Sequence, residues 1–91
     1  MKKRLLEFVK ENVSEISEKI GCDGIDEIRI DNMGDVSGTG IYLDDDGDEM
    51  EGGLSFRWSD EVDDEFVGEN GDESVEIEVG GEKISYIGYN I

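Results

Sequence analysis

The fold is decided in residues 2–30, KKRLLEFVKENVSEISEKIGCDGIDEIRI, where the spacing of the hydrophobic residues changes. Up to Gly21 these residues recur three or four apart, which places them on one face of a helix. Gly21 occupies the position where a glycine commonly ends a helix, and Glu15 with Lys19 forms a favourable i,i+4 pair. We therefore predict an amphipathic helix over residues 2–20. Its apolar face comprises Leu5, Leu6, Val9, Val13, Ile16 and Ile20.

Beyond Gly21 the hydrophobic residues alternate with polar ones, which is typical of strands. Residues 32–35 and the Gly80-Gly81 pair have the composition of tight turns, and residues 44–53 that of an acidic loop. One helix and about five strands predict an α+β fold, a single acidic domain over residues 1–91 with the N-terminal helix packed on one face of an antiparallel sheet. The expected strands cover residues 28–30, 36–43, 54–58, 75–79 and 83–91.

Residues 59–67, SDEVDDEFV, fit two local structures. One is a short helix capped by Ser59, with Val62 and Phe66 one turn apart. The other is an irregular loop, and the sequence does not decide between them.

Net charge is the dominant feature of the composition. The chain has 26 acidic and 8 basic residues, a net charge of -18, whereas a small domain usually carries roughly 2–8 charges net. Residues 1–20 hold five cations and four acids, a balance of +1, and residues 21–91 hold three cations and 22 acids, a balance of -19. Self-repulsion on this scale destabilises a compact chain, so we expect the acidic surface to have a use. The basic start, Lys2 to Arg4, either pairs with this acidic body or stays solvated.

Missing residue types exclude several function classes. The chain has no His, Pro, Ala or Gln, and Cys22 is its one cysteine. His is the commonest general base and a common transition-metal ligand, and one cysteine forms no internal disulfide, which favours a reducing compartment. No apolar run approaches the roughly 18 residues of a membrane span, and charged residues interrupt the stretch where a signal peptide needs an apolar core. We expect a cytoplasmic protein with no cofactor, no membrane contact and no direct nucleic-acid contact.

Acidic residues gather in three clusters along the chain. The first two fall on expected connections, and part of the third on the outward side of a strand, so that loops and the outer sheet face present a field of carboxylates. The first cluster is Asp44, Asp45, Asp46, Asp48, Glu49 and Glu51; the second is Asp60, Glu61, Asp63, Asp64 and Glu65; the third is Glu69, Asp72, Glu73, Glu76 and Glu78.

Aromatic residues divide between core and surface in this prediction. Phe56 and Trp58 alternate with polar residues and are expected in the core. Tyr42 lies on the face opposite Ile41 and Leu43, so we expect it to be exposed beside the first acidic cluster. Tyrosine is enriched at the centres of interfaces, which makes Tyr42 a candidate anchor for a partner.

Two chemical interpretations of the carboxylates lack necessary residues. Asp44, Asp46 and Asp48 have the spacing that begins an EF-hand calcium loop, but Glu49 stands where that loop needs Gly and Ser55 where it needs a bidentate Glu. Catalysis by paired carboxylates needs a cleft and separated pKa values, which acids in solvated connections do not have. An enzyme is therefore disfavoured, and a divalent-cation-binding module is an alternative to be tested.

The whole charge is better explained by a basic partner. A solvated acidic surface explains any one cluster, but solubility needs nothing near -18, and adaptation to high salt usually brings many Ala and few Lys, whereas this chain has no Ala and five Lys. Carboxylates on a rigid scaffold can occupy a groove whose Lys and Arg bind phosphates. Opposite net charge also accelerates association.

In size, charge and composition the chain resembles the small acidic inhibitors of phages and mobile elements, the anti-CRISPR and anti-restriction proteins that mimic DNA. The resemblance covers the whole chain and includes no shared motif. It implies a non-enzymatic viral protein, acting in the host cytoplasm, that binds the basic nucleic-acid-binding surface of a restriction nuclease or CRISPR-Cas effector and blocks it. Immunity proteins of nuclease toxins have similarly acidic surfaces and are the nearest alternative.

Overall fold

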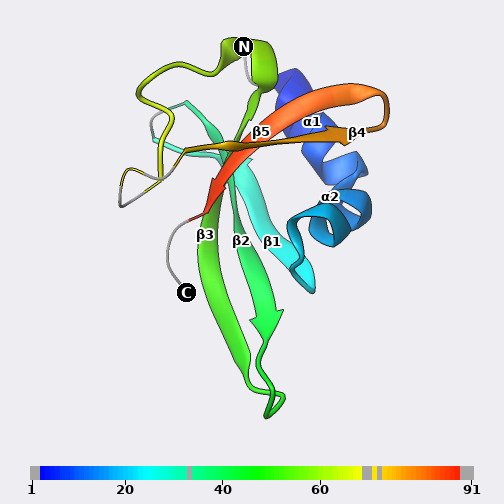
Figure 1. The fold of residues 1–91 in the computed structure, drawn as a ribbon. Helices are drawn as coiled ribbons and strands as arrows, with labels where there is room; N and C mark the ends of the chain where they lie inside the picture. The colour runs from blue at the N-terminus through cyan, green and yellow to red at the C-terminus, as the bar shows by residue number, and fades with distance from the viewer. Residues whose placement is uncertain (1–2, 33, 69–70, 72, 89–91) are drawn as a thin grey trace.

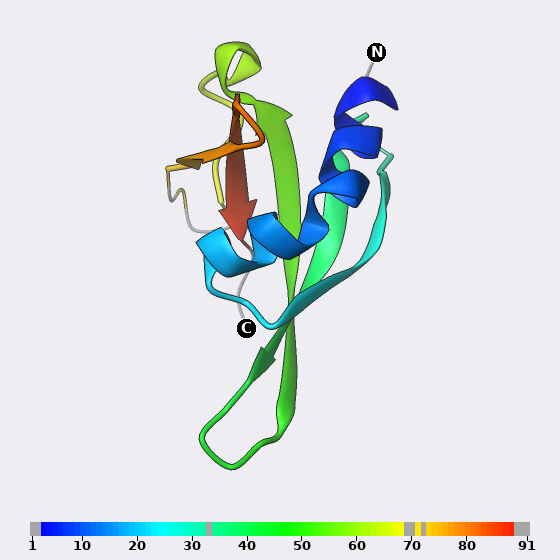
Figure 2. The same ribbon diagram turned by 90° about the vertical axis from the view of Figure 1, so that its right-hand side faces the viewer.

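The computed structural model describes residues 3–32, 34–68, 71 and 73–88. All strand pairs are antiparallel, in the order β1-β2-β3-β5-β4, and the two helices cover one face of this sheet (Figures 1 and 2). The α+β fold predicted from the sequence is confirmed. Its elements are α1 (Lys3–Glu11), α2 (Val13–Ile20), β1 (Gly24–Ile30), β2 (Val36–Leu43), β3 (Glu49–Trp58), the 3-10 helix η1 (Ser59–Glu61), β4 (Val75–Val79) and β5 (Glu82–Gly88).

The N-terminal helix is interrupted at Asn12, so the prediction of one continuous helix over residues 2–20 was wrong on this point. The side-chain amide of Asn12 donates to the Phe8 carbonyl oxygen at 2.9 Å. An asparagine that bonds the backbone in this way competes with the helical hydrogen bonds and turns the chain. The predicted end is confirmed, because Gly21 has a left-handed φ of 93° and donates its N–H to the Ser17 carbonyl. Neither helix of the described chain is long and apolar enough to cross a membrane.

The apolar stripe of the helices forms the core with alternate residues of the sheet. Leu5, Val9 and Ile16 have no exposed surface, and burial stabilises each such side chain by roughly 1.5–3 kcal/mol. The prediction that Phe56 lies in the core is confirmed, whereas Trp58 is only partly buried and packs against the core. On the sheet side the core comprises Ile25, Val36, Leu54, Phe56, Val79 and Ile84.

The prediction of which β2 residues point toward the helices was wrong. Val36 and Gly40 are buried on the side of the helices, whereas Leu43 is 56% exposed. Glycine is needed on the inward side, because a Cβ atom at Gly38 would lie 3.0 Å from the Ile25 side chain. Close packing against β1 therefore selects glycine at position 38, and the alternation places Tyr42 on this inward side.

The β2–β3 hairpin is longer than predicted. Residues 44–53 were expected to form a loop, but β3 begins at Glu49 and pairs with β2 from there. Among the described residues, β1 pairs along β2 only as far as Ile41, and β5 along β3 only as far as Leu54. Residues 41–51 therefore project from the sheet as a two-stranded hairpin arm at one end of the molecule (Figures 1 and 2).

Residues 59–68, which we call the covering segment, pack on the face of the sheet opposite the helices. Only η1 is helical, and the remainder is irregular, so each of the two predicted structures holds for part of the segment. Ser59 makes no side-chain cap; its hydroxyl oxygen lies 2.9 Å from that of Ser85. Phe66 is 3% exposed. The expectation of an outer sheet face open to solvent is therefore wrong over β3 and β5, where three outward residues are buried: Ser55, Ser85 and Ile87.

The β4–β5 hairpin agrees with its prediction. Gly80 and Gly81 have φ values of 56° and 81°, which suit a two-residue turn between antiparallel strands. The last strand was expected over residues 83–91; β5 is observed over Glu82–Gly88, and residues 89–91 lie outside the described part of the chain.

Candidate protein-binding surface

The hairpin arm is supported at its base by one residue of the α2–β1 connection. The Asp23 N–H donates to the Ile41 carbonyl oxygen at 2.8 Å, and its carboxylate accepts the Leu43 N–H at 2.8 Å. These two bonds extend the sheet by one residue beyond β1. Past Leu43 the arm is held, among the described residues, by its own two strands and turn alone.

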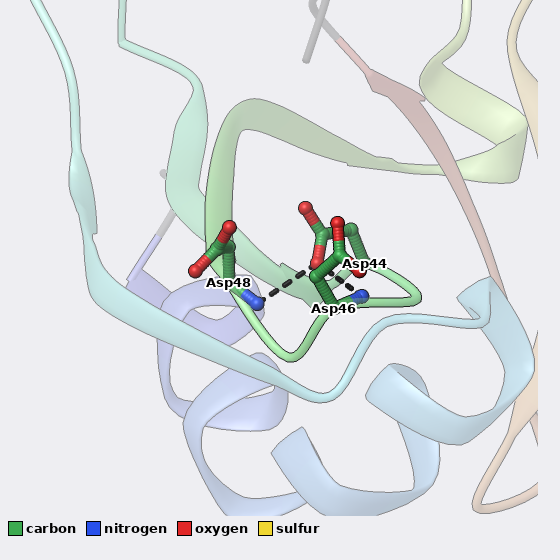
Figure 3. Close-up of side chains that lie close together, drawn as sticks. All are labelled: Asp44, Asp46 and Asp48. Atoms are coloured by element: carbon green, nitrogen blue, oxygen red, sulfur yellow. Dashed lines mark hydrogen bonds between the residues drawn. The ribbon is translucent and has the colours of Figure 1, made fainter.

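The turn at the end of the arm is organised by Asp44. One oxygen of its carboxylate accepts the backbone N–H of Asp46 at 2.9 Å and that of Asp48 at 2.8 Å (Figure 3). Gly47 has a left-handed φ of 83° and donates to the Asp44 carbonyl oxygen at 3.0 Å. An aspartate that bonds the following N–H groups fixes a tight turn, so the acidic end of the arm has a defined shape.

The arm carries six acidic residues and no cation. All six are exposed, and none forms an ion pair with any described residue. The structure thus brings the whole first cluster predicted from the sequence onto one projecting element. Its members are Asp44, Asp45, Asp46, Asp48, Glu49 and Glu51.

Two apolar side chains are exposed beside these carboxylates. Leu43 is 56% exposed and Met50 is 40% exposed. They belong to adjoining cross-strand pairs, Leu43 with Glu49 and Tyr42 with Met50, so they lie on opposite faces of the arm. Neither exposed side chain was predicted, because Leu43 was expected on the face opposite the exposed Tyr42 and Met50 fell within the expected acidic loop.

Tyr42 is half-buried, which corrects the expectation of an exposed anchor. A Cβ atom at Gly40 would lie 3.1 Å from its ring, so the ring folds back over that glycine toward the core. Burial raises the pKa of the Tyr42 phenol above 10.0, with Cys22 and Tyr86 contributing. Because its hydroxyl end is partly withdrawn from water, Tyr42 supports the base of the arm and does not project from it.

The second cluster lies on the covering segment, where Arg57 neutralises Asp63. Arg57, on the outward face of β3, bonds Asp35 at 2.9 Å and Asp63 at 3.1 Å, and its guanidinium carbon lies 4.8 Å from the centroid of the Phe66 ring. The hydrogen bond to Asp35 raises the pKa of Arg57 above its usual value. All five acidic residues of this cluster are exposed, although the bond from Arg57 to Asp63 holds the segment against the sheet. They are Asp60, Glu61, Asp63, Asp64 and Glu65.

The third cluster is only partly described. Glu76 and Glu78 are exposed on β4, opposite Ser85 and Lys83 of β5. This agrees with the prediction that they point outward from the sheet. Glu73 is exposed as well. Glu69 and Asp72 lie outside the described residues.

Three carboxylates of the arm meet the simplest geometric condition for a cation. Oxygens of Asp44, Asp46 and Asp48 lie within 4.8 Å of one another (Figure 3). Glu49 and Ser55, at the positions where an EF-hand needs Gly and Glu, are residues of β3. This stretch therefore does not form an EF-hand loop.

A groove of about 570 Å³ is lined by residues from the start of α1, from η1 and from the β4–β5 hairpin. These elements lie at the end of the molecule opposite the arm (Figures 1 and 2). Sequence reasoning did not find the groove, because its residues come from four separate segments. The only signal was the basic start of the helix, where the helix dipole disfavours cations. The lining residues include Arg4, Trp58, Asp60, Glu76, Glu82 and Lys83.

No protein similar to this chain is found among family models, curated proteins or solved structures.

Proposed function

We propose that the protein is a non-enzymatic inhibitor that inserts its hairpin arm into the basic nucleic-acid-binding surface of a target protein. The observation that carries this proposal is the arm itself: six exposed carboxylates on one projecting element, with no cation of the described chain paired to them. Nucleases and CRISPR-Cas effectors, the targets implied by the resemblance, bind phosphates through clusters of Lys and Arg. The arm offers such a cluster an alternative set of anions.

Both charge and shape support this mode of binding. A net charge of -18 attracts a basic partner from a distance and accelerates encounter. The turn fixed by Asp44 holds the carboxylates on a narrow element, so little conformational entropy is lost on binding. Leu43 and Met50 add apolar contact beside the charges, and hydrophobic contact of this kind slows dissociation of an electrostatic encounter complex.

Charge reversal on the arm tests the proposal. Asp45, Asp46 and Asp48 are changed together to Lys, while Asp44 is kept because it holds the turn. Wild-type and variant proteins serve as bait in pull-downs from the native host, with bound proteins identified by mass spectrometry. We expect the wild type to retain a basic nucleic-acid-binding protein that the variant loses, and added DNA or RNA to compete for it.

A matched control has the same change of net charge elsewhere. Glu7, Glu11 and Glu18 are exposed on the helices, and their reversal to Lys should leave binding largely intact once salt is adjusted. Affinity for the wild type should fall steeply with rising salt, because exposed charges are screened. Equal loss in both triple variants, or affinity that does not respond to salt, would contradict insertion of the arm.

The carboxylate group of Asp44, Asp46 and Asp48 supports one alternative, a divalent-cation-binding module. Titration calorimetry with Ca²⁺ at physiological salt separates the two functions. Saturable micromolar binding that Asp46→Asn abolishes would favour the cation module. If the captured partner is instead a nuclease toxin, the protein is an immunity protein acting through the same surface.

A further inference from the structure

The groove opposite the arm already holds a guanidinium of this chain. The Arg4 guanidinium carbon lies 4.5 Å from the centroid of the Trp58 ring, and one of its nitrogens lies 3.6 Å from a carboxylate oxygen of Glu82. An aromatic face and a carboxylate together are the two groups that recognise a planar guanidinium. The groove therefore has the chemistry of an arginine site.

Arg4 occupies this position loosely. Its side chain is 70% exposed and that of Glu82 is 42% exposed, and ion pairs in such settings contribute little to stability. It also leaves acidic side chains of the lining without a cation, namely Asp60 and Glu76. Asp60 and Glu76 are exposed and form no ion pair with the described residues.

We propose that this groove binds an arginine side chain of a partner protein, which displaces Arg4 from the Trp58 ring and is held by Glu82. Charge complementarity selects a basic side chain, and the ring selects a planar one, so arginine binds better than lysine. The site goes beyond the proposed role of the arm: it lies at the other end of the molecule and uses other residues. A partner that reaches both ends is held at two places.

Trp58 is the only tryptophan of the chain, so its fluorescence reports on the groove directly. The probe is N-acetyl-arginine amide, compared with its lysine counterpart and with the neutral isostere N-acetyl-citrulline amide. We expect a saturable fluorescence change with the arginine compound, a weaker one with lysine and none with citrulline. Arg4→Ala should raise the affinity for arginine by about two- to fivefold, because the competing guanidinium is gone.

Two matched controls separate this site from general attraction to a negative protein. Lys10→Ala removes an exposed cation of α1 without opening the ring and should leave the affinity unchanged. Glu82→Gln should weaken binding, whereas Asp45→Asn on the arm, with the same change of charge, should not. Equal changes in affinity for Arg4→Ala and Lys10→Ala, or for Glu82→Gln and Asp45→Asn, would overturn the proposal. Binding of the citrulline compound as tightly as the arginine compound would also overturn it. None of these measurements involves the partner of the arm, so failure here leaves the arm proposal standing, and the reverse also holds.

Discussion

The hairpin arm and the covering segment have nearly the same composition and opposite structures. Residues 41–51 contain six acids and residues 59–68 contain five, and neither segment contains a cation. The arm projects from the sheet, whereas the covering segment is bound against it (Figures 1 and 2). Phe66 makes the difference: it is 3% exposed and lies under Arg57, while the apolar residues of the arm, Leu43 and Met50, remain exposed.

Acidic content therefore does not decide whether a segment is available to a partner. A segment of this charge is retained on the surface of the fold only where an apolar side chain is buried and a cation compensates nearby carboxylates. The covering segment has both, through Phe66 and Arg57. The arm has neither, and its carboxylates remain available to another protein.

Removing the anchor of the covering segment should have the largest effect. Phe66→Ala deletes a buried aromatic ring and its contact with Arg57, and such a change costs about 3 kcal/mol of unfolding free energy. Urea unfolding followed by circular dichroism measures the loss. Leu43→Ala on the arm is the matched control, since a side chain already 56% exposed should change stability by less than about 0.5 kcal/mol. Similar losses in both variants would remove the contrast between the two segments.

Removing the cation should have the next largest effect. Arg57→Ala leaves Asp35, whose side chain is 14% exposed, without its bidentate partner, and we expect a loss of about 2 kcal/mol. Arg29→Ala, at an exposed cation of β1, is the control and should change stability little. The losses from Arg57→Ala and Phe66→Ala should not add in the double variant, because the two side chains are in contact. Strict additivity would show that the covering segment is not held by this pair.

The sequence predicted the fold more completely than the site, for physical reasons. Hydrophobic spacing is a local property, and it located the N-terminal helical segment and all five strands, although not the division of that segment into α1 and α2. The orientation of β2 was predicted wrongly, because three of its residues are glycine or another small residue. The side that faces the helices is determined by the close approach of Ile25 to Gly38. The break at Asn12 coincides with a side-chain bond to the Phe8 carbonyl oxygen, which periodicity does not reveal.

The sequence shows which acidic residues are close along the chain, but it does not show their structural environments. Exposure of the arm follows from where β1 and β5 stop pairing, which depends on long-range register. Burial of Phe66 depends on the outward face of β3, where Arg57 meets Asp35 across 22 residues of sequence. The groove around Trp58 is assembled from four segments, so no local pattern could have indicated it.

The base of the arm can be tested through a matched pair of glycines. Gly40→Ala places a Cβ atom 3.1 Å from both the Tyr42 ring and the Leu54 side chain, and we expect a loss of about 1 kcal/mol as the ring moves. Gly24→Ala meets nothing within 4 Å and should be neutral or stabilise by about 0.5 kcal/mol, because the unfolded chain loses freedom. Thermal unfolding compares the two, and equal shifts would mean that Tyr42 does not pack on Gly40.

The packing of Tyr42 on Gly40 also affects stability at high pH. Burial raises the pKa of Tyr42 above 10.0, so folding favours the protonated phenol and stability falls as the pH rises through and above that range. Displacement of the ring in Gly40→Ala lowers this pKa toward 10.0, and the fall in stability above pH 10 becomes smaller. Absorbance titration of the phenols at alkaline pH, with Tyr42→Phe as reference, identifies the residue. An unchanged titration in Gly40→Ala would contradict the packing.

The smallest expected effect lies within the arm itself, between two neighbouring aspartates. Asp44 accepts two backbone N–H groups, whereas the exposed side chain of Asp45 forms no hydrogen bond or ion pair with any described residue. Asp44→Ala should cost about 0.5–1 kcal/mol and speed amide hydrogen exchange at Asp46 and Asp48, while Asp45→Ala should do neither. Because both variants lose one negative charge, only the turn distinguishes them. If partner binding falls more for Asp44→Ala than for Asp45→Ala, the shape of the arm contributes to recognition; if both fall equally, charge alone carries it.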